Sequence, residues 1–206
     1  MPTRTSPTRQ RRAARTRRAI LQVALELIEQ QGAEKLSLRE VARQIDYSPA
    51  ALYEYFPNKD ALLQALRGEV DRQLEQVLRA LPAAPTFAER LVQAGLACLR
   101  YAQEQPQRFS LLASPNQVPA ADPGARLVFA EILQGGAQAG EFLPDPALGT
   151  VEMAHMLWAL VYGLAALGQS SPAEGQAEEA LRWLVRAIPT HESQNSNTDH
   201  QKSNET

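Results

Sequence analysis

Residues 37–59 constrain the fold of this chain most, because they carry two helix starts in close succession. Ser37 is followed three residues later by Glu40, which matches the S-x-x-E capping box, in which each side chain accepts a hydrogen bond from a free backbone N–H. Ser48 and Pro49 mark a second start, since a serine hydroxyl caps a helix and proline fits the first helical position. Two such short helices in series are typical of a helix-turn-helix.

The turn between these helices and the end of the second one are also marked in the sequence. Asp46 stands where a left-handed residue is needed, and aspartate adopts that conformation more readily than most residues other than glycine. Pro57 ends the second helix, and Asn58 is expected to cap the next one. The apolar residues expected to face the core are Leu38, Val41, Ala42, Ile45, Leu52 and Phe56. We therefore expect a helix-turn-helix over about residues 37–56.

A longer stretch around this unit resembles a known family. The run L-Y-E-Y-F-P-N-K-D-A-L-L at residues 52–63, preceded by S-L-R-E-V-A-R-Q-I-D-Y-S-P, resembles the DNA-binding domain of the TetR family of transcriptional regulators. Residues 19–32 are similar to that family's first helix and its glycine stop, and the resemblance covers residues 14–66. Two departures are visible: Asp46 stands where the family usually has glycine, and residues 50–51 are Ala-Ala where a glycine-threonine or polar pair is common.

The position of each residue in this motif implies its contact with DNA. The residues expected to face base edges are Arg39, Pro49, Ala50 and Tyr53. Those expected to contact phosphate are Ser37, Ser48, Tyr55 and Lys59. Arginine can grip guanine through two hydrogen bonds, whereas Ala50 offers only a methyl contact. Partial packing on the first helix is the alternative for Tyr53.

The charge distribution favours the same end of the chain. The whole sequence has a net charge of −2, but residues 1–66 carry +4 and residues 67–206 carry −6. Residues 1–18 contain seven arginines and no acidic residue, so they would attract phosphate whatever the base sequence. A solubilising tail is the alternative interpretation. We expect residues 1–13 to form a disordered basic arm and residues 189–206, which have little to bury, to form a disordered tail.

Composition predicts an all-α fold, since leucine, alanine, glutamine, glutamate and arginine dominate and β-branched residues are sparse. We expect a three-helix DNA-binding domain at residues 14–66 and a helical ligand-binding and dimerisation domain at residues 67–188. Helices are expected at about 14–31, 58–80, 86–105, 106–112, 123–139, 147–167 and 173–188. Residues 113–122 are predicted to form a mobile loop.

The apolar pattern of the last two expected helices predicts a homodimer. The helix at 147–167 is apolar nearly all round, so it needs burial on more than one side. One side would pack on its own domain and the other on a second copy, together with apolar residues of the helix at 173–188, namely Ala180, Leu181, Leu184 and Ile188. The family resemblance implies the same four-helix interface. A monomer with a central helix is the alternative; a homodimer would present two recognition helices to a pseudo-palindrome.

A small-molecule site is also expected in this half. Residues 155–167, with residues 105–112, are similar to the C-terminal domain of a TetR subgroup with a Trp-x-x-x-His-Gly motif, although Tyr162 replaces the histidine. The side chains that could line a pocket between helices are Phe109, Leu112, Phe129, Trp158 and Tyr162. A plain core is the alternative for each of them.

Catalysis and membrane insertion find no support in the sequence. No metal-ligand spacing, phosphate loop or nucleophile motif is present, and His155 is more simply a core or interface histidine. Cys98 lies in an apolar helical pattern, so a buried thiol is expected and redox sensing is the alternative. The longest apolar stretch, residues 156–167, is too short to span a bilayer, and no signal peptide is found. We expect a cytoplasmic protein that is not an enzyme and has no cofactor, metal or membrane partner.

The leading hypothesis is therefore a homodimeric repressor that binds double-stranded DNA at a pseudo-palindromic operator and is released by an unknown small-molecule effector. An interaction protein that keeps the fold without binding DNA is the rival from another class. The retention of Arg39, Tyr53, Tyr55 and Lys59 beside the arginine arm argues against that rival. An enzyme ranks third, because no constellation of catalytic residues supports it.

Overall fold

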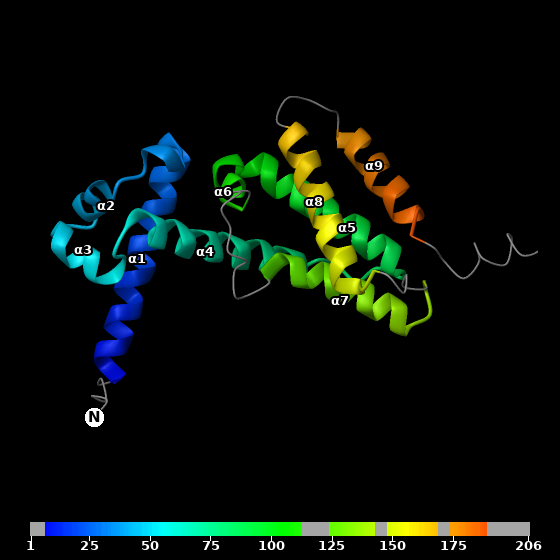
Figure 1. Ribbon diagram of the computed structural model, residues 1–206, viewed down its shortest axis with the longest axis horizontal. Helices are drawn as coiled ribbons and strands as arrows, with labels where there is room; N and C mark the ends of the chain where they lie inside the picture. Colours follow the sequence, from blue (N-terminus) through cyan, green and yellow to red (C-terminus); the bar gives the residue numbers. More distant parts are fainter. Residues whose placement is uncertain (1–6, 113–123, 143–147, 169–173, 189–206) are drawn as a thin grey trace, which may run out of the picture. The chain divides into compact units, whose positions relative to one another are not determined.

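The computed structural model describes residues 7–112, 124–142, 148–168 and 174–188, and the regular elements in these ranges are all helical (Figure 1). This confirms the all-α prediction. The elements are α1 Pro7–Gln31, the 3₁₀ helix η1 Ala33–Lys35, α2 Leu38–Gln44, α3 Pro49–Tyr55, α4 Lys59–Arg79, α5 Phe87–Glu104, α6 Pro106–Leu111, α7 Gly124–Gln138, α8 Thr150–Gly168 and α9 Glu174–Arg186.

The chain divides into two compact units. The first comprises Met1–Asp71 and Gln105–Ala120, and the second comprises Arg72–Glu104 and Ala121–Thr206. The division after Asp71 falls inside α4, and α6 belongs to the first unit. The domain limits expected from the sequence, after residues 66 and 188, remain predictions.

The first unit is built on the apolar face of α1. Ile20, Ala24, Leu27 and Ile28 are buried there, together with apolar residues of α2 and α3. Of the core residues predicted for the two short helices, Leu38, Val41, Ala42, Leu52 and Phe56 are buried. Ile45 is partly exposed, because it is the residue that ends α2.

Helix α1 begins earlier than the sequence suggested. Residues 7–13 were expected to belong to a disordered arm, but α1 starts at Pro7. Proline suits a first helical turn, and the arginines, alanines and glutamine that follow are strong helix formers. The helix stops at Gly32, which has a φ of 84°. A residue with a side chain would adopt this left-handed backbone conformation only at a cost in free energy. Residues 1–6 lie outside the described residues.

Helix α5 is the common packing partner of α7, α8 and α9 in the second unit (Figure 1). At its start, the Phe87 ring stacks on Phe142 with 4.7 Å between ring centroids. The Glu141 carboxylate accepts from the Phe87 backbone N–H at 2.7 Å and from Arg90 at 3.4 Å. Cys98 is fully buried in this helix, and burial raises the pKa of its thiol. The interpretation as a buried apolar thiol therefore fits better than redox sensing.

The apolar face of the last helix packs within its own chain instead of on a second copy. Leu181 and Ile188 were predicted to pack on a second copy, but both are buried within this chain, with Val185 between them. Leu181 lies so close to Gly95 of α5 that a methyl group there would come within 2.9 Å of it. Trp183 is instead the exposed apolar side chain of α9, with 70% of its surface accessible.

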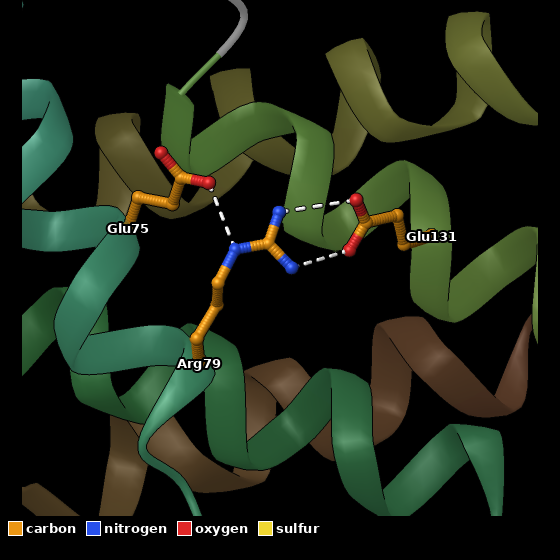
Figure 2. A network of polar contacts seen from close by, with 3 residues as sticks. All are labelled: Glu75, Arg79 and Glu131. Atoms are coloured by element: carbon orange, nitrogen blue, oxygen red, sulfur yellow. Dashed lines mark hydrogen bonds and ion pairs between the residues drawn. The ribbon is translucent and has the colours of Figure 1, made fainter.

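A polar network joins the end of α4 to α7 within the second unit (Figure 2). The Arg79 guanidinium donates to both carboxylate oxygens of Glu131, at 2.7 and 3.0 Å. Its Nε donates to Glu75, one helical turn earlier, at 2.8 Å. Arg79 therefore holds carboxylates of two helices at once, and the Glu131 pair has the two-pronged geometry of strong charge-assisted hydrogen bonds.

The loop predicted at 113–122 and the tail predicted at 189–206 lie outside the described residues. The other helix limits agree with the expected ones to within a few residues; α8 starts at Thr150 rather than at residue 147.

Candidate nucleic-acid interface

The turn between α2 and α3 has the left-handed geometry expected from the sequence. Asp46 has a φ of 55°. The Tyr47 backbone N–H then donates to the Ala42 carbonyl at 2.9 Å, which reverses the chain after α2. The Tyr47 hydroxyl lies 3.4 Å from Oγ1 of Thr16, so the turn is also tied to α1. These contacts fix where α3 begins relative to α1 and α2.

Two of the predicted helix caps are present. The Ser48 hydroxyl accepts from the Ala51 backbone N–H at 3.2 Å, with Pro49 in the first turn of α3. The Asn58 side-chain oxygen accepts from the Ala61 backbone N–H at 2.8 Å at the start of α4. Both satisfy backbone donors that have no partner inside their own helix.

The capping box predicted at Ser37 is not formed. Ser37 precedes α2, but its side chain makes no capping hydrogen bond. The Glu40 carboxylate instead accepts from the Arg43 guanidinium. That hydrogen bond lowers the pKa of Glu40 and raises that of Arg43. A guanidinium one turn away competes well for the carboxylate, because a charge-assisted hydrogen bond is stronger than one to a neutral backbone N–H.

The residues predicted to face bases are all exposed. Pro49, Ala50 and Tyr53 are all exposed on α3, and Arg39 is exposed on α2. Tyr53 keeps 45% of its surface accessible, so packing on α1 does not bury it. The buried side of α3 is carried by Leu52, which leaves the opposite face available to a ligand.

Sequence reasoning overlooked Glu54, which is exposed beside Tyr53. It lies one turn after Ala50, so helical spacing would have placed it on the same face. A glutamate can accept a hydrogen bond from the amino group of cytosine, and it repels phosphate. Glu54 is therefore a candidate base-contacting residue.

The residues predicted to contact phosphate differ in what they already bind. Ser37 and Ser48 are exposed, while Tyr55 is partly buried. The Lys59 ammonium donates to the backbone carbonyl of Glu34 at 2.6 Å. An ammonium has three donors, so that contact leaves Lys59 able to bind a phosphate as well. The phosphate contacts themselves remain predictions.

The arginines near the start of α1 fall into two groups. Arg17 packs on the recognition unit: its guanidinium carbon lies 4.4 Å from the Phe56 ring centroid, and the same group donates to the Tyr55 carbonyl at 3.5 Å. The other exposed arginines of this segment are Arg9, Arg11, Arg12, Arg15 and Arg18. They lie on a helix, so their charge is held along one element next to α2 and α3.

The five residues predicted to line a ligand pocket do not all lie in one unit. Phe109 and Leu112 belong to the first unit, and Phe129, Trp158 and Tyr162 to the second. In the second unit, Phe129 and Trp158 meet edge to face with 6.3 Å between centroids. Burial raises the pKa of the Tyr162 hydroxyl. The pocket remains a prediction.

Two family models match the chain. Residues 20–66 match the model described as bacterial regulatory proteins of the tetR family, and residues 91–188 match the tetracyclin repressor-like C-terminal domain. The chain belongs to the TetR family. The first match covers α2, α3 and most of the predicted DNA contacts, and the second covers α5 to α9. This TetR-family chain is accordingly a regulator rather than an enzyme.

A curated relative matches the N-terminal part of this TetR-family protein. The chain is 36% identical over 66 residues to the HTH-type nicotine-responsive transcriptional repressor HdnoR of Paenarthrobacter nicotinovorans. The match spans 32% of this chain and 32% of the relative's length.

Solved structures of other proteins share the fold. RolR in complex with resorcinol is 15% identical with a TM-score of 0.71, covering 88% of this chain and 91% of RolR. A protein of unknown function from Rhodococcus sp. RHA1 is 21% identical with a TM-score of 0.70, covering 92% of this chain and 98% of its own. At these identities the likeness concerns the fold alone. In the described part of the TetR-family chain, no helix is long and apolar enough to cross a membrane.

Proposed function

We propose that this TetR-family protein is a homodimeric repressor that binds a pseudo-palindromic operator and is released from it by a small-molecule effector. The observation that carries the DNA-binding part is the exposed face of α3 with Pro49, Ala50 and Tyr53, in a unit that also exposes Arg39 on α2. The left-handed Asp46 and the Ser48 cap hold that face in place.

Few side chains of this face can form hydrogen bonds with bases. Arg39 is its one side chain able to grip guanine in two places, and Tyr53 and Glu54 can each make a single polar contact. Pro49 and Ala50 offer only apolar contacts. Phosphate contacts and DNA shape therefore carry much of the proposed recognition.

A gel-shift titration with the DNA upstream of the protein's own gene tests DNA binding. Lys59→Ala is expected to weaken binding to all sequences alike and to lower the slope of log affinity against log salt by about one, since one phosphate contact is lost. Lys59→Arg keeps the charge and should keep the slope. Equal slopes for Lys59→Ala and wild type would contradict the phosphate role. Thermal unfolding of both variants checks that loss of the bond to Glu34 has not unfolded the first unit.

The dimer proposal is supported by apolar side chains left exposed on α8 and α9. Val151 and Met156 expose 55% and 61% of their surface on α8, and Trp183 exposes 70% on α9. Val151, His155 and Ala159 recur on one exposed stripe of α8, next to Met156. Large exposed apolar side chains on adjacent parts of the sequence favour a protein partner, and a second copy gives a closed two-fold interface.

The proposal of a small-molecule effector is supported by the ligands named for two similar proteins. The curated relative is named as nicotine-responsive, and RolR was solved with resorcinol. Trp158 and Tyr162 are partly exposed and could contact a ring-shaped effector, while the buried Phe129 supports Trp158 from behind. The proposed release works through α4, which continues from the first unit into the second. Effector binding would favour the state that cannot bind DNA.

The similarity of residues 155–167 to the Trp-x-x-x-His-Gly subgroup remains part of this proposal. A thermal-shift screen with aromatic compounds and hydrophobic cations tests the effector site. A rise in melting temperature that disappears in Trp158→Ala would support it, and the absence of any binder would count against it.

A further inference from the structure

A polar cleft of about 430 Å³ opens in the first unit, between the end of α1, η1, α4 and α6. Its volume lies in the range of small-molecule sites. All of its lining residues belong to the first unit, and none of them is among the residues assigned above to DNA or to the effector. Gly32, with its φ of 84°, turns the chain sharply here and leaves Gln107 of α6 facing the turn.

The cleft contains a buried donor that lacks an acceptor. Nε of Arg67 is buried and has no hydrogen-bond partner among the described residues. Buried polar atoms in folded proteins are nearly always paired, and an unpaired cationic donor is especially costly. The Nε–H of an arginine, together with its neighbouring Nη–H, matches the two oxygens of a carboxylate. Arg67 is therefore the natural anchor for an oxyanion in this cleft.

The remaining charges around the cleft also favour an anion. Lys35 adds a second cation, against the single carboxylate of Glu34. The backbone carbonyl of Glu34 already accepts from Lys59, so this carbonyl is partly used as a hydrogen-bond acceptor. Gln31 and Gln107 contribute amide groups that can donate further hydrogen bonds.

Part of the lining, next to Arg67, is apolar. Leu63 lies one helical turn before Arg67 on α4, and Leu111 comes from α6. Residues four apart on a helix share a face, so the apolar wall and the guanidinium stand side by side. Leu111 is buried and Leu63 is partly exposed, so an anion with an apolar body would cover the part of Leu63 that an inorganic anion leaves in water.

We propose that this cleft binds a small organic carboxylate, whose oxygens accept from Arg67 and whose apolar body lies on Leu63 and Leu111. Its lining shares no residue with the proposed effector site or with the DNA-binding face. Because α4 and α6 supply two of its walls, a bound ligand strengthens the packing of α6 in the first unit, where Arg108 of α6 is already paired with Glu29 of α1.

Isothermal titration calorimetry on the full chain without DNA tests this site, with benzoate as the probe. Benzamide, the neutral analogue, and inorganic phosphate are titrated at the same ionic strength. Benzoate is expected to bind saturably and at least about tenfold more tightly than either. Arg67→Gln, which removes the charge and Nε, should weaken benzoate by at least about tenfold. Arg100→Gln on α5, an exposed arginine outside the cleft, should change nothing.

A second variant keeps the test decisive if Arg67→Gln fails to fold. Ala33→Leu fills the cleft without changing any charge and should also weaken benzoate. The proposal is overturned if benzoate shows no saturable binding up to about 10 mM. It is equally overturned if neither variant alters benzoate binding, or if phosphate or benzamide binds as tightly as benzoate. DNA binding is measured separately, so failure of this site leaves the repressor proposal intact.

Discussion

Arg17 belongs to the arginine-rich segment of α1, yet its guanidinium covers the Phe56 ring and donates to the Tyr55 carbonyl. Arg17→Ala is expected to lower the free energy of unfolding by about 0.5–1 kcal/mol, the usual range for an exposed cation–π contact. Urea denaturation followed by circular dichroism measures this. Arg18→Ala removes the same charge from an exposed neighbour and should have a smaller effect. Equal losses would mean that charge alone, and not the contact with Phe56, is responsible.

Two adjacent glycines of α7 offer a second matched comparison. A methyl group at Gly136 would lie 2.7 Å from two carbon atoms of Phe87, whereas at Gly135 it would meet nothing within 4 Å. Gly136→Ala is therefore expected to destabilise the second unit by about 1–3 kcal/mol through overpacking. Gly135→Ala should be neutral or stabilising by up to about 1 kcal/mol, since alanine favours a helix. Thermal unfolding separates the two; similar melting temperatures would contradict the close approach of Phe87.

The success of the sequence predictions at single residues depended on local competition. Ser48 and Asn58 cap their helices as expected, each accepting from the backbone N–H three residues later. Ser37 and Glu40 fit the same kind of pattern, but Arg43 takes the Glu40 carboxylate. The capping-box rule considers only the spacing of Ser37 and Glu40, so it does not account for a competing donor such as Arg43.

At the scale of elements, the contact between α4 and α7 depends on the ion pairs of Arg79 in Figure 2. Glu131→Gln is expected to cost about 0.2–1 kcal/mol at neutral pH, because both partners are nearly half exposed. The hydrogen bond from Arg79 holds the pKa of Glu131 below its ordinary value of 4.5. The contribution is therefore present above pH 4.5 and lost as the pH falls towards the folded-state pKa.

Urea denaturation at pH 7 and at about pH 3 measures this, with the difference between wild type and Glu131→Gln shrinking in acid. Added salt should shrink it as well. Glu179→Gln, an exposed carboxylate in the middle of α9, serves as the control and should show no such dependence. A Glu131→Gln effect that is the same at both pH values would exclude the ion pair as its cause.

Helical periodicity predicted which faces are apolar but not what covers each face. On α3, periodicity was sufficient to predict both faces. Leu52 and Phe56 had to be buried. The residues on the other side were therefore exposed, namely Pro49, Ala50 and Tyr53. On α9 periodicity was not sufficient, because both sides carry apolar residues. Leu181 faces Gly95 of α5 and Ile188 is buried, while Trp183 is left outside. Only tertiary packing distinguishes a face that meets its own domain from one that meets a partner.

At the scale of the whole molecule, the order of helices along the chain did not reveal how they group. Helix α6 follows α5 directly, yet it packs with α1, where Arg108 pairs with Glu29. Phe109 and Leu112 therefore belong to the first unit, although the sequence suggested a common pocket with Phe129. Such long-range pairings leave no local signal, because any charged or apolar surface of suitable shape can accept α6.

The proposed dimer can be tested by placing a charge on its expected interface. Met156→Arg places a charge on the exposed apolar stripe of α8, so it should leave each chain folded and shift the protein towards monomer. Sedimentation velocity measures the mass, and gel shift should show weaker operator binding, because one recognition helix cannot hold two half-sites. Leu127→Arg introduces the same charge at another exposed apolar residue, on α7, and should leave both measurements unchanged. If Met156→Arg remained fully dimeric, α8 could not form the interface, and the exposed Trp183 of α9 would have to be explained by another partner.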